Sequence, residues 1–438
     1  MALSFLHDPT ASEIEQTTMR RVALRLVPLL ILGYIVAYLD RVNVGFAALD
    51  MNRDVQLSPS VFGFGAGLFF VSYFLFEIPS NLVLNKVGAR RWIARILVTW
   101  GIVSGLTALV QGPMTFYGVR FLLGAAEAGF YPGVILYITW WFPDSYRSRM
   151  ISLFQAAIPI SVIFGSIISG TILSLHGMLG LAGWQWLFII EALPPIVLGI
   201  VFLYVLTDRP EQAEWLSPEQ QSWLSGRLAK ERAAQEAVRR YRLGEAMSNP
   251  RVWALTVVYF GNAFAAYGLT FFLPQIVHRF GVSYFATGLI TAVPYVFAVV
   301  AMVGWGLHAD RRGERRLHCA AAFFLSFVGL ASCVFLNNPV VLMVAIVLAQ
   351  MGQSSIAPTF WPLPGAMLTG VAAAGGIAMI NSVGNLGGFF GPYAVGLVRA
   401  ATGSFGLGML VIASGMLVGS IVLLLLRPER DAKVGWPG

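Results

Sequence analysis

Six ionisable side chains lie inside long apolar stretches of this 438-residue sequence: Asp40, Arg41, Glu77, Arg120, Glu127 and Glu191. An isolated charge at the centre of a bilayer costs at least about 2.5–3.5 kcal/mol, so residues of this kind are functional candidates. A carboxylate can avoid the cost by taking up a proton, whereas an arginine stays charged and needs a partner or a cavity. These residue types therefore indicate proton binding and anion binding.

The spacing predicts that Arg120 lies opposite two of the acids. Asp40 is fifteen residues beyond Arg25, about 22 Å along a helix, and Arg120 lies about 10 Å along a helix from Pro113, which enters at the opposite end. In a core about 30 Å thick, Asp40 and Arg120 would share a depth, with Glu127 two turns below. We expect Arg120 to pair with Asp40 or Glu127 when either is ionised and to be released when both are protonated. Asp40, Arg120 and Glu127 are our proton-coupling candidates.

Asp40 and Arg41 are adjacent, yet they need not contact each other. Neighbours on a helix point about 100° apart, and Arg41 shares a stripe with Tyr34 and Tyr38. A guanidinium flanked by phenols suits a substrate carboxylate, which it can bind with two hydrogen bonds. We therefore expect Arg41 and Tyr38 to bind substrate. The alternative is a buried Asp–Arg pair that only fixes helix packing.

The two remaining acids are expected to have structural roles. Glu77 precedes Pro79, and Glu191 precedes Pro194 and Pro195. Proline removes a hydrogen bond within a helix, so each carboxylate could bond the backbone groups that are freed.

The sequence carries too little charge for a soluble protein. Hydrophobic residues make up 57% of it and charged residues 11%, with a mean hydropathy of +0.73, whereas soluble chains carry roughly 25% charged residues. We therefore predict an all-α membrane protein in the lipid bilayer. Apolar stretches long enough to span it occur at 22–46, 61–84, 92–110, 114–141, 150–174, 184–206, 252–277, 284–307, 317–336, 339–365, 372–398 and 404–426.

The lysines and arginines are concentrated on one side of the membrane. Of the 29 lysines and arginines, 24 fall in alternate connections, 3 on the opposite side and 2 within the apolar stretches. By the positive-inside rule both termini are cytoplasmic. We expect the protein to lie in the plasma (inner) membrane. The net charge of +8 is then a topology signal, and we expect no nucleic-acid partner. The polar first twenty residues contain no apolar core with a cleavage site, so no signal peptide is expected.

A polar segment divides the twelve spans into six and six. We predict an N-terminal six-helix bundle at 1–206, a cytoplasmic linker with short surface helices at 207–250, and a C-terminal bundle at 251–438. Ser217 and Pro218 have the form of a helix start. The mixed charges of the linker favour a solvated face, with a regulatory role as the alternative.

The two halves repeat one loop. NLVLNKVGARR (81–91) aligns with GLHADRRGERR (306–316) at an offset of 225 residues, so that Gly88 matches Gly313. The second copy resembles the loop motif of the major facilitator superfamily. The first copy departs from it at Asn81 and Asn85, which indicates a weaker helix-latching role there. A duplicated transporter of this kind places its substrate site between the repeats.

Four further stretches resemble the anion:cation symporter family within that superfamily. They are YLDRVNVGFA (38–47), FEIPSN (76–81), RFLLGAAEAGFYPG (120–133), and FWPLPGAML with INSVGNLGGFFGPY (360–393). The resemblance implies uptake of small organic acids with a cation, usually a proton; bacterial members carry tartrate, phthalate or hydroxyphenylacetate. It also adds Tyr73, Gln155 and Tyr267 as substrate-binding candidates.

The candidates in the C-terminal half are neutral. Asn381 and Asn385 lie one turn apart, among glycines that allow close helix approach, and their amides can bond hydroxyls or a second carboxylate. Trp361, between Pro358 and Pro362, is expected at a helix break, where its ring could stack on a substrate. The alternative for Trp361 is plain packing.

These observations predict a proton-coupled symporter that takes up a small hydroxy, aromatic or dicarboxylic acid by alternating access. No phosphate-binding glycine loop and no metal-ligand spacing occurs, so we expect no enzyme activity, no cofactor and no metal. Protons are favoured over sodium, and a monomer is expected. The first alternative is an exporter or antiporter of metabolites or drugs, against which 157–170 lacks the antiporter glycine–proline run. The second is a non-transporting receptor.

Overall fold

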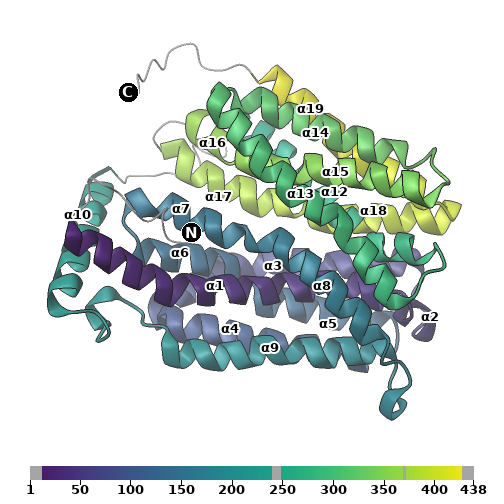
Figure 1. The fold of residues 1–438 in the computed structure, drawn as a ribbon, viewed down its shortest axis with the longest axis horizontal. Helices are drawn as coiled ribbons and strands as arrows, with labels where there is room; N and C mark the ends of the chain where they lie inside the picture. Colours follow the sequence, from purple (N-terminus) through teal and green to yellow (C-terminus); the bar gives the residue numbers. More distant parts are fainter. Residues whose placement is uncertain (1–11, 239–247, 368–370, 427–438) are drawn as a thin grey trace. The chain divides into compact units, whose positions relative to one another are not determined.

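The computed structural model describes residues 12–238, 248–367 and 371–426, and these residues form helices and connections without strands. The chain divides into two compact units. The first unit contains residues 1–57, 68–239 and 282–289. Its elements are α1 (Glu13–Ala47), α2 (Met51–Asp54), most of α3 (Pro59–Val87), α4 (Ala89–Leu106) with a 3₁₀ turn at Thr107–Leu109, α5 (Pro113–Glu127), α6 (Phe130–Trp141), α7 (Asp144–Gln155), α8 (Ala157–Leu173), α9 (Gly183–Val205) and α10 (Pro218–Val238) (Figure 1).

The second unit contains residues 58–67, 240–281 and 290–438. Its elements are the first turns of α3, α12 (Pro250–His278), most of α13 (Tyr284–Arg312), α14 (Arg315–Ser332), α15 (Pro339–Phe360), α16 (Pro362–Met367), α17 (Val371–Asn385), α18 (Gly387–Thr402) and α19 (Phe405–Leu425). Each unit thus takes the first turns of one helix from the other half of the sequence. The continuous limits 1–206, 207–250 and 251–438 stay a prediction.

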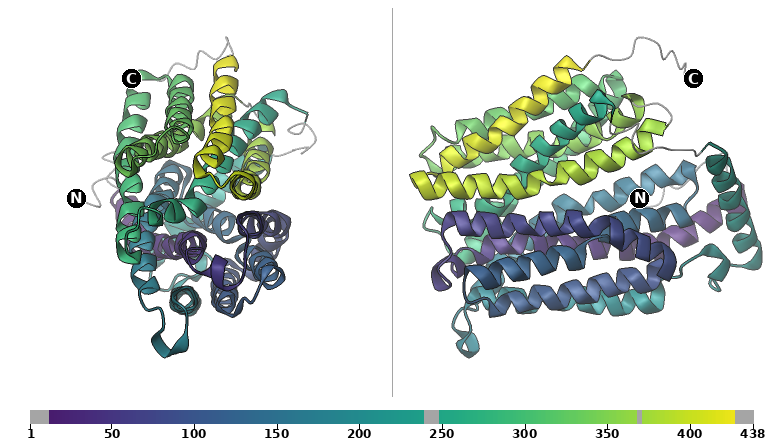
Figure 2. Two further views of the ribbon diagram at one scale, coloured as in Figure 1. Left: turned by 90° about the vertical axis from the view of Figure 1, so that its right-hand side faces the viewer. Right: turned by 180° about the vertical axis from the view of Figure 1, so that it is seen from behind.

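Every one of the twelve predicted spans has a helical counterpart, which confirms the all-α membrane fold. Ten helical segments of the described residues are long and apolar enough to cross a membrane. The spans expected at 317–336 and 372–398 correspond to α14 and to α17 with α18. Viewed along their axes, the helices of the first unit run alongside one another as a bundle (Figure 2).

Glycines bring the helices of each bundle close together. In the first unit α4 packs on α9, where a Cβ on Gly101 would lie 3.0 Å from the Ala192 carbonyl oxygen. In the second unit α14 packs on α15, where a Cβ on Gly352 would lie 2.6 Å from the Ala322 carbonyl oxygen. Apolar side chains on the outer faces stay exposed, among them Val300 at 70%. Small residues inside and apolar residues outside are the pattern of a bundle solvated by lipid.

The linker folds as its sequence indicates. Ser217 Oγ accepts from the Gln220 backbone N–H at 3.2 Å, and Gln220 Oε1 accepts from the Ser217 N–H at 3.3 Å. This reciprocal pair is a capping box, and α10 begins there. The helix packs on α1 and α6 (Figure 1), and Arg21 donates to Gln220 Oε1 at 3.1 Å.

The repeated loop is built on its glycines, because Gly88 and Gly313 both have positive φ (+95° and +67°), a conformation that favours glycine. In the second copy Arg315 pairs with Asp310 at 2.9 Å. In the first copy, which lacks that aspartate, the carboxylate comes from the linker: Asp208 Oδ1 accepts from the Arg90 N–H at 2.7 Å, at the start of α4.

Asp208 therefore caps α4 from outside the helix, and its removal should destabilise the first unit. Asp208→Ala should lower the free energy of unfolding by about 1 kcal/mol, and Asp208→Asn by less, since the amide still accepts a hydrogen bond. Thermal unfolding in detergent measures the change. Glu211→Ala, which removes a nearby linker carboxylate that caps no helix, is the control. Equal melting temperatures for Asp208→Ala and the unsubstituted protein would contradict this role.

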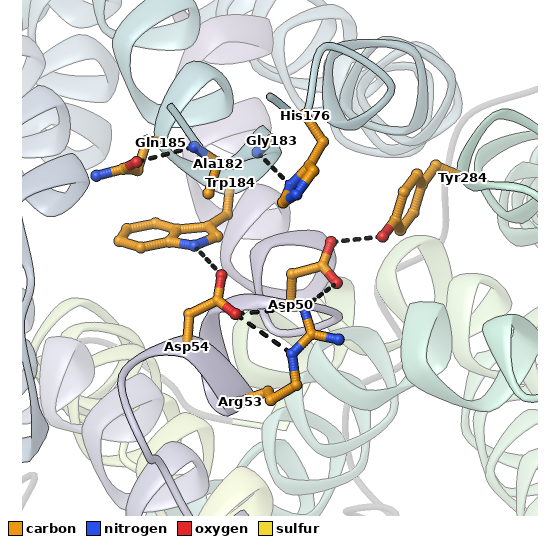
Figure 3. Close-up of polar contacts among 9 residues, drawn as sticks. All are labelled: Asp50, Arg53, Asp54, His176, Ala182, Gly183, Trp184, Gln185 and Tyr284. Atoms are coloured by element: carbon orange, nitrogen blue, oxygen red, sulfur yellow. Dashed lines mark hydrogen bonds and ion pairs between the residues drawn. The ribbon is translucent and has the colours of Figure 1, made fainter. Parts of the chain in front are cut away.

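Hydrogen bonds and ion pairs between polar side chains connect α2 to the starts of α9 and α13 in the first unit (Figure 3). Asp50 and Asp54 both pair with Arg53, at 3.5 and 3.3 Å. Asp54 Oδ2 also accepts from Trp184 Nε1 at 3.0 Å, and Asp50 Oδ2 accepts from the Tyr284 hydroxyl at 2.7 Å. These bonds hold α2 against the starts of α9 and α13.

Candidate functional site

The central feature of the first unit is an ion pair between α1 and α5. Arg41 Nε donates to Glu127 Oε1 at 2.9 Å and its Nη2 donates to the same oxygen at 2.5 Å. The Arg41 side chain is 11% exposed and that of Glu127 is 1% exposed. The second oxygen, Glu127 Oε2, is buried and has no hydrogen-bond partner among the described residues. One oxygen of the acid thus holds the arginine, while the other is open to a proton.

Aromatic rings surround this arginine. The Arg41 guanidinium carbon lies 5.2 Å from the ring centre of Tyr38, 5.4 Å from Phe69 and 5.5 Å from Tyr73. The structure therefore brings the sequence candidates Tyr38, Arg41 and Tyr73 together, as part of one group with Glu127. Phe69 was missed, because a phenylalanine in an apolar stretch carries no signal of its own.

The predicted partner of Glu127 was wrong. We expected Arg120 to pair with Glu127 or Asp40, but the hydrogen bonds to Glu127 come from Arg41. Arg120 is 1% exposed and lies with its guanidinium carbon 5.3 Å from the Phe69 ring centre. The charges of Glu127 and Asp40 still act on it. The rotation of α1 about its axis explains the error, since it turns Arg41 toward α5 and Asp40 away.

Asp40 binds neutral donors instead of an arginine. Its Oδ2 accepts from Trp100 Nε1, and its Oδ1 accepts from Ser104 Oγ at 3.0 Å and from Asn43 Nδ2 at 3.1 Å. Asp40 is 2% exposed. Sequence reading missed the three donors, although Trp100 and Ser104 lie one turn apart on α4 and Asn43 lies one turn after Asp40.

The backbone roles predicted for the two other acids were also wrong. Glu77 is 7% exposed, and its carboxylate makes no hydrogen bond within the described residues; the charge of Arg41 acts on it. Glu191 is 5% exposed and accepts a hydrogen bond from Ser169 Oγ at 2.9 Å. Neither carboxylate bonds a backbone group freed by a proline. Glu77 instead belongs to the surroundings of Arg41.

Gln155 extends the same region. Its Nε2 donates to the Tyr131 hydroxyl at 3.0 Å, and the Tyr131 ring centre lies 5.5 Å from that of Tyr34. Tyr34 in turn lies 5.3 Å from Tyr38. A row of phenols therefore connects Gln155 to the Arg41 group. Tyr131 was not predicted, although it lies within the GFYPG stretch.

Three of the candidate polar residues, Glu127, Gln155 and Asn385, lie where a helix is interrupted. Glu127 is the last residue of α5, after which Ala128 leaves helical geometry (ψ 129°) and Gly129 has φ +90°. Gln155 is the last residue of α7 and Asn385 is the last residue of α17. The residues that follow them, Ala156 and Leu386, keep backbone dihedrals of the right-handed helical region, so the chain bends there without leaving helical geometry. Interrupted helices inside a membrane are tolerated where they line a cavity or bind a substrate. The interruptions therefore favour these residues as site residues.

In the second unit the neutral candidates lie on α12 and α17 and at the break between α15 and α16. Trp361 separates α15 from α16, so the predicted helix break is present. Its ring centre lies 5.0 Å from that of Tyr259, a residue that sequence reading missed. Asn385 Nδ2 donates to Asn381 Oδ1 at 3.3 Å. Tyr267 lies one turn before Phe271 on α12, with ring centres 5.9 Å apart.

The predicted close approach of glycines on this side is confirmed. A Cβ on Gly384 would meet the Tyr259 ring, and one on Gly391 would meet the Phe264 backbone. Helices α17 and α18 therefore press against α12 and hold Tyr259 beside Trp361. The second unit presents aromatic rings and amides and, among its candidate residues, no charge.

Comparison with known proteins agrees with this architecture. Residues 30–392 match the family model of the Major Facilitator Superfamily. An Agrobacterium vitis protein named "Putative tartrate transporter" is 50% identical over 426 residues, which cover 97% of this chain and 98% of that protein. A "Quinolone resistance transporter" of Acinetobacter baumannii is 40% identical, with 96% and 97% of the two chains covered. The inner membrane transport protein RhmT of Escherichia coli is 37% identical, with 93% and 94% covered.

Solved structures share the fold at low identity. A bacterial homologue of the human lysosomal transporter Spinster matches with a TM-score of 0.75 at 15% identity, over 91% of this chain and 96% of that one. The xylose transporter XylE of E. coli matches with a TM-score of 0.72 at 14% identity, over 94% and 100%.

Proposed function

Because the chain belongs to the Major Facilitator Superfamily, a family of membrane transporters, we propose that it takes up a small organic acid together with a proton, by alternating access. The observation that carries the proposal is the buried pair of Arg41 and Glu127, set among tyrosines. An arginine held by an acid is also the group that a substrate carboxylate would bind.

The pair supplies a physical basis for coupling. A substrate carboxylate and an ionised Glu127 compete for one guanidinium. A proton on Glu127 removes its charge and releases Arg41 to the substrate, so proton binding and substrate binding favour each other. Substrate affinity should therefore rise as the pH falls. Asp40 and Arg120 take part as the other proton-coupling residues, since their charges act on each other. Sodium is the less favoured cation.

The uncharged residues recognise the remainder of the substrate. We assign substrate contacts to Tyr38, Tyr73 and Gln155 in the first unit. In the second unit we assign them to Tyr267, Trp361, Asn381 and Asn385. The relatives named for tartrate point to a hydroxy or dicarboxylic acid, and aromatic acids fit the rings around Trp361. The protein would work in the bacterial inner membrane, as a monomer with both termini in the cytoplasm.

Asn381→Ala should alter which acids are accepted more than it alters proton coupling, because no titrating group changes. Loss of one hydrogen bond to a substrate hydroxyl costs about 0.5–1.5 kcal/mol, so the preference for hydroxy acids should fall about two- to tenfold. Competition of a panel of acids against one labelled substrate measures the preference. Ser382→Ala, which lies about 100° around the same helix, is the control. An unchanged order of preference would remove Asn381 from the site.

Export of drugs or metabolites is the second candidate. It is favoured by the 40% identity to the quinolone resistance transporter. Two features oppose it: the missing glycine–proline run at 157–170, and an arginine placed to bind an anion.

Purified protein in liposomes distinguishes the two. With an acidic exterior, an importer should accumulate labelled tartrate or a related acid inside, and dissipating the pH gradient should abolish accumulation. Accumulation of a cationic quinolone driven by the opposite gradient, without any uptake of carboxylic acids, would establish export and overturn the proposal.

A further inference from the structure

A second group of buried polar residues, two acids and an amide, lies in the first unit, away from the Arg41–Glu127 pair. It consists of Asp40 and Asn43 on α1 and Glu191 on α9, with exposed fractions of 2%, 0% and 5%. Asn43 Nδ2 donates to Asp40 Oδ1 at 3.1 Å, and the Asn43 side chain also lies close enough to the Glu191 carboxyl group to act on it. One amide thus connects two carboxyl groups.

The two acids differ in how their oxygens are satisfied. Asp40 accepts from three donors, Trp100, Ser104 and Asn43, a set that fits an ionised carboxylate. Glu191 has one donor, Ser169 Oγ, on its Oε1 at 2.9 Å. Its Oε2 is buried without a hydrogen-bond partner, and so is Asn43 Oδ1. Two neighbouring buried acceptors without a donor are unfavourable.

A single proton resolves both deficits. We propose that Glu191 is a further proton-binding residue of this protein, with the proton on Oε2 donated to Asn43 Oδ1. Oε1 is then the carbonyl oxygen, and it accepts from Ser169. Nothing beyond a proton from water is needed, and Glu191 becomes neutral when it binds.

The surroundings of Glu191 favour this assignment. Helix α9 packs on α1, α4 and α8. Beside Glu191, α8 contributes Ser169, whereas α4 contributes Trp100 and Ser104 as neutral donors to Asp40. From α1 comes Asp40, whose negative charge opposes a second negative charge on Glu191. Arg120 and Glu127 act on Asp40, so the group is electrostatically linked to the proposed coupling residues.

The side-chain amide of Asn43 would allow the proton to be held by Asp40 instead of Glu191. If Asn43 turns over, its Nδ2 can donate to Glu191 Oε2 and its Oδ1 can accept from a protonated Asp40. Asp40 and Glu191 would then hold one proton between them, on one acid or the other. This step rests on the proposed function, in which Asp40 takes part in coupling.

Infrared difference spectroscopy of the full-length protein in lipid bilayers tests the inference. A protonated carboxyl gives a carbonyl stretching band that an ionised one lacks. We expect this band at neutral pH, its loss in Glu191→Gln, and its shift to higher frequency in Ser169→Ala, which removes the donor to the carbonyl oxygen without removing the acid. Glu231→Gln, in the linker helix, should leave the band unchanged. A spectrum in which Glu191→Gln removes no band would overturn the inference.

Transport measurements keep this outcome separate from the proposed function. If the carbonyl band of Glu191 is present but substrate uptake does not depend on the pH gradient, the proton site is supported and proton-coupled symport is rejected. Proton-driven uptake without a Glu191 band would sustain symport and reject the site. If both hold, Glu191→Gln should also change the pH profile of uptake, which a purely structural role would leave in place.

Discussion

Replacing Arg41 by alanine should abolish substrate binding. The guanidinium is the positive group placed among tyrosines in the first unit, with Tyr38 and Tyr73 within 5.5 Å of it. A charge-assisted hydrogen bond contributes about 1.5–3 kcal/mol, so the loss of two should weaken binding by at least about a hundredfold. Arg41→Lys keeps the charge but loses the planar fork, and should weaken binding by about tenfold or more. Isothermal titration or thermal shift with the transported acid measures both.

The control must separate lost binding from lost folding. Arg41→Ala leaves Glu127 buried without its counter-ion, which is destabilising by itself. The double variant Arg41→Ala/Glu127→Gln removes both charges and should regain thermal stability without regaining substrate affinity. Arg399→Ala removes a guanidinium that bonds Gln275 in the second unit, and should bind substrate normally. Affinity within a few-fold of the unsubstituted protein in Arg41→Ala would exclude Arg41 from the site.

The fold follows from features that single stretches of sequence carry. Twelve apolar runs predicted twelve spans, because a backbone in lipid must satisfy its own hydrogen bonds and therefore forms helices. Ser217 and Pro218 predicted the start of α10, since the signal for a helix start depends only on neighbours in sequence. Gly88 and Gly313, which lie 225 residues apart in matching sequences, likewise identified the repeated loop.

The partners of the buried charges could not be predicted in this way. Arg41 and Glu127 are 86 residues apart, and their contact depends on how far α1 is rotated about its axis and on where α5 ends. A rotation of about 100° exchanges the directions of Asp40 and Arg41. Periodicity therefore identified the charged residues correctly but could not decide which of the two faces α5. The break at Gly129 was the available signal, since a helix that ends at Glu127 re-aims that side chain.

The candidates from the C-terminal half illustrate a second limit. Trp361 and the asparagines were visible from prolines and glycines nearby, whereas Tyr259 was one aromatic residue among many. Its place beside Trp361 follows from the close approach of α17 to α12 at Gly384. Such a contact between segments more than a hundred residues apart has no local signature.

Replacing Glu127 by glutamine should uncouple transport from the proton gradient without preventing transport itself. Glutamine has nearly the volume of the protonated acid and carries no charge. Arg41 is then permanently available to a substrate carboxylate, so the variant should bind substrate at least as well as the unsubstituted protein at high pH. Exchange of labelled for unlabelled substrate across a liposome membrane should also persist, because the loaded carrier moves without a change of protonation at this residue.

Accumulation should fail for the same reason. Uphill transport requires proton binding and substrate binding to bias one conformational equilibrium, and in the variant the proton no longer affects Arg41. With only a pH gradient applied, substrate should equilibrate but not concentrate, and the exchange rate should lose most of its pH dependence. The assay compares counterflow with proton-driven uptake in the same liposomes. Glu231→Gln, which removes a linker carboxylate paired with Arg227, should behave normally in both.

The result also decides between two locations of coupling. If Glu127→Gln still concentrates substrate, the competition between Glu127 and substrate for Arg41 is not the coupling step, and Asp40 becomes the principal candidate. Asp40 accepts hydrogen bonds from Trp100, Ser104 and Asn43, which are neutral donors, so its protonation would act on Arg41 through helix packing. Asp40→Asn in the same assay would then abolish accumulation by itself. Loss of accumulation in Glu127→Gln with exchange intact instead assigns coupling to the ion pair, where one proton decides whether Arg41 is held by the protein or by the substrate.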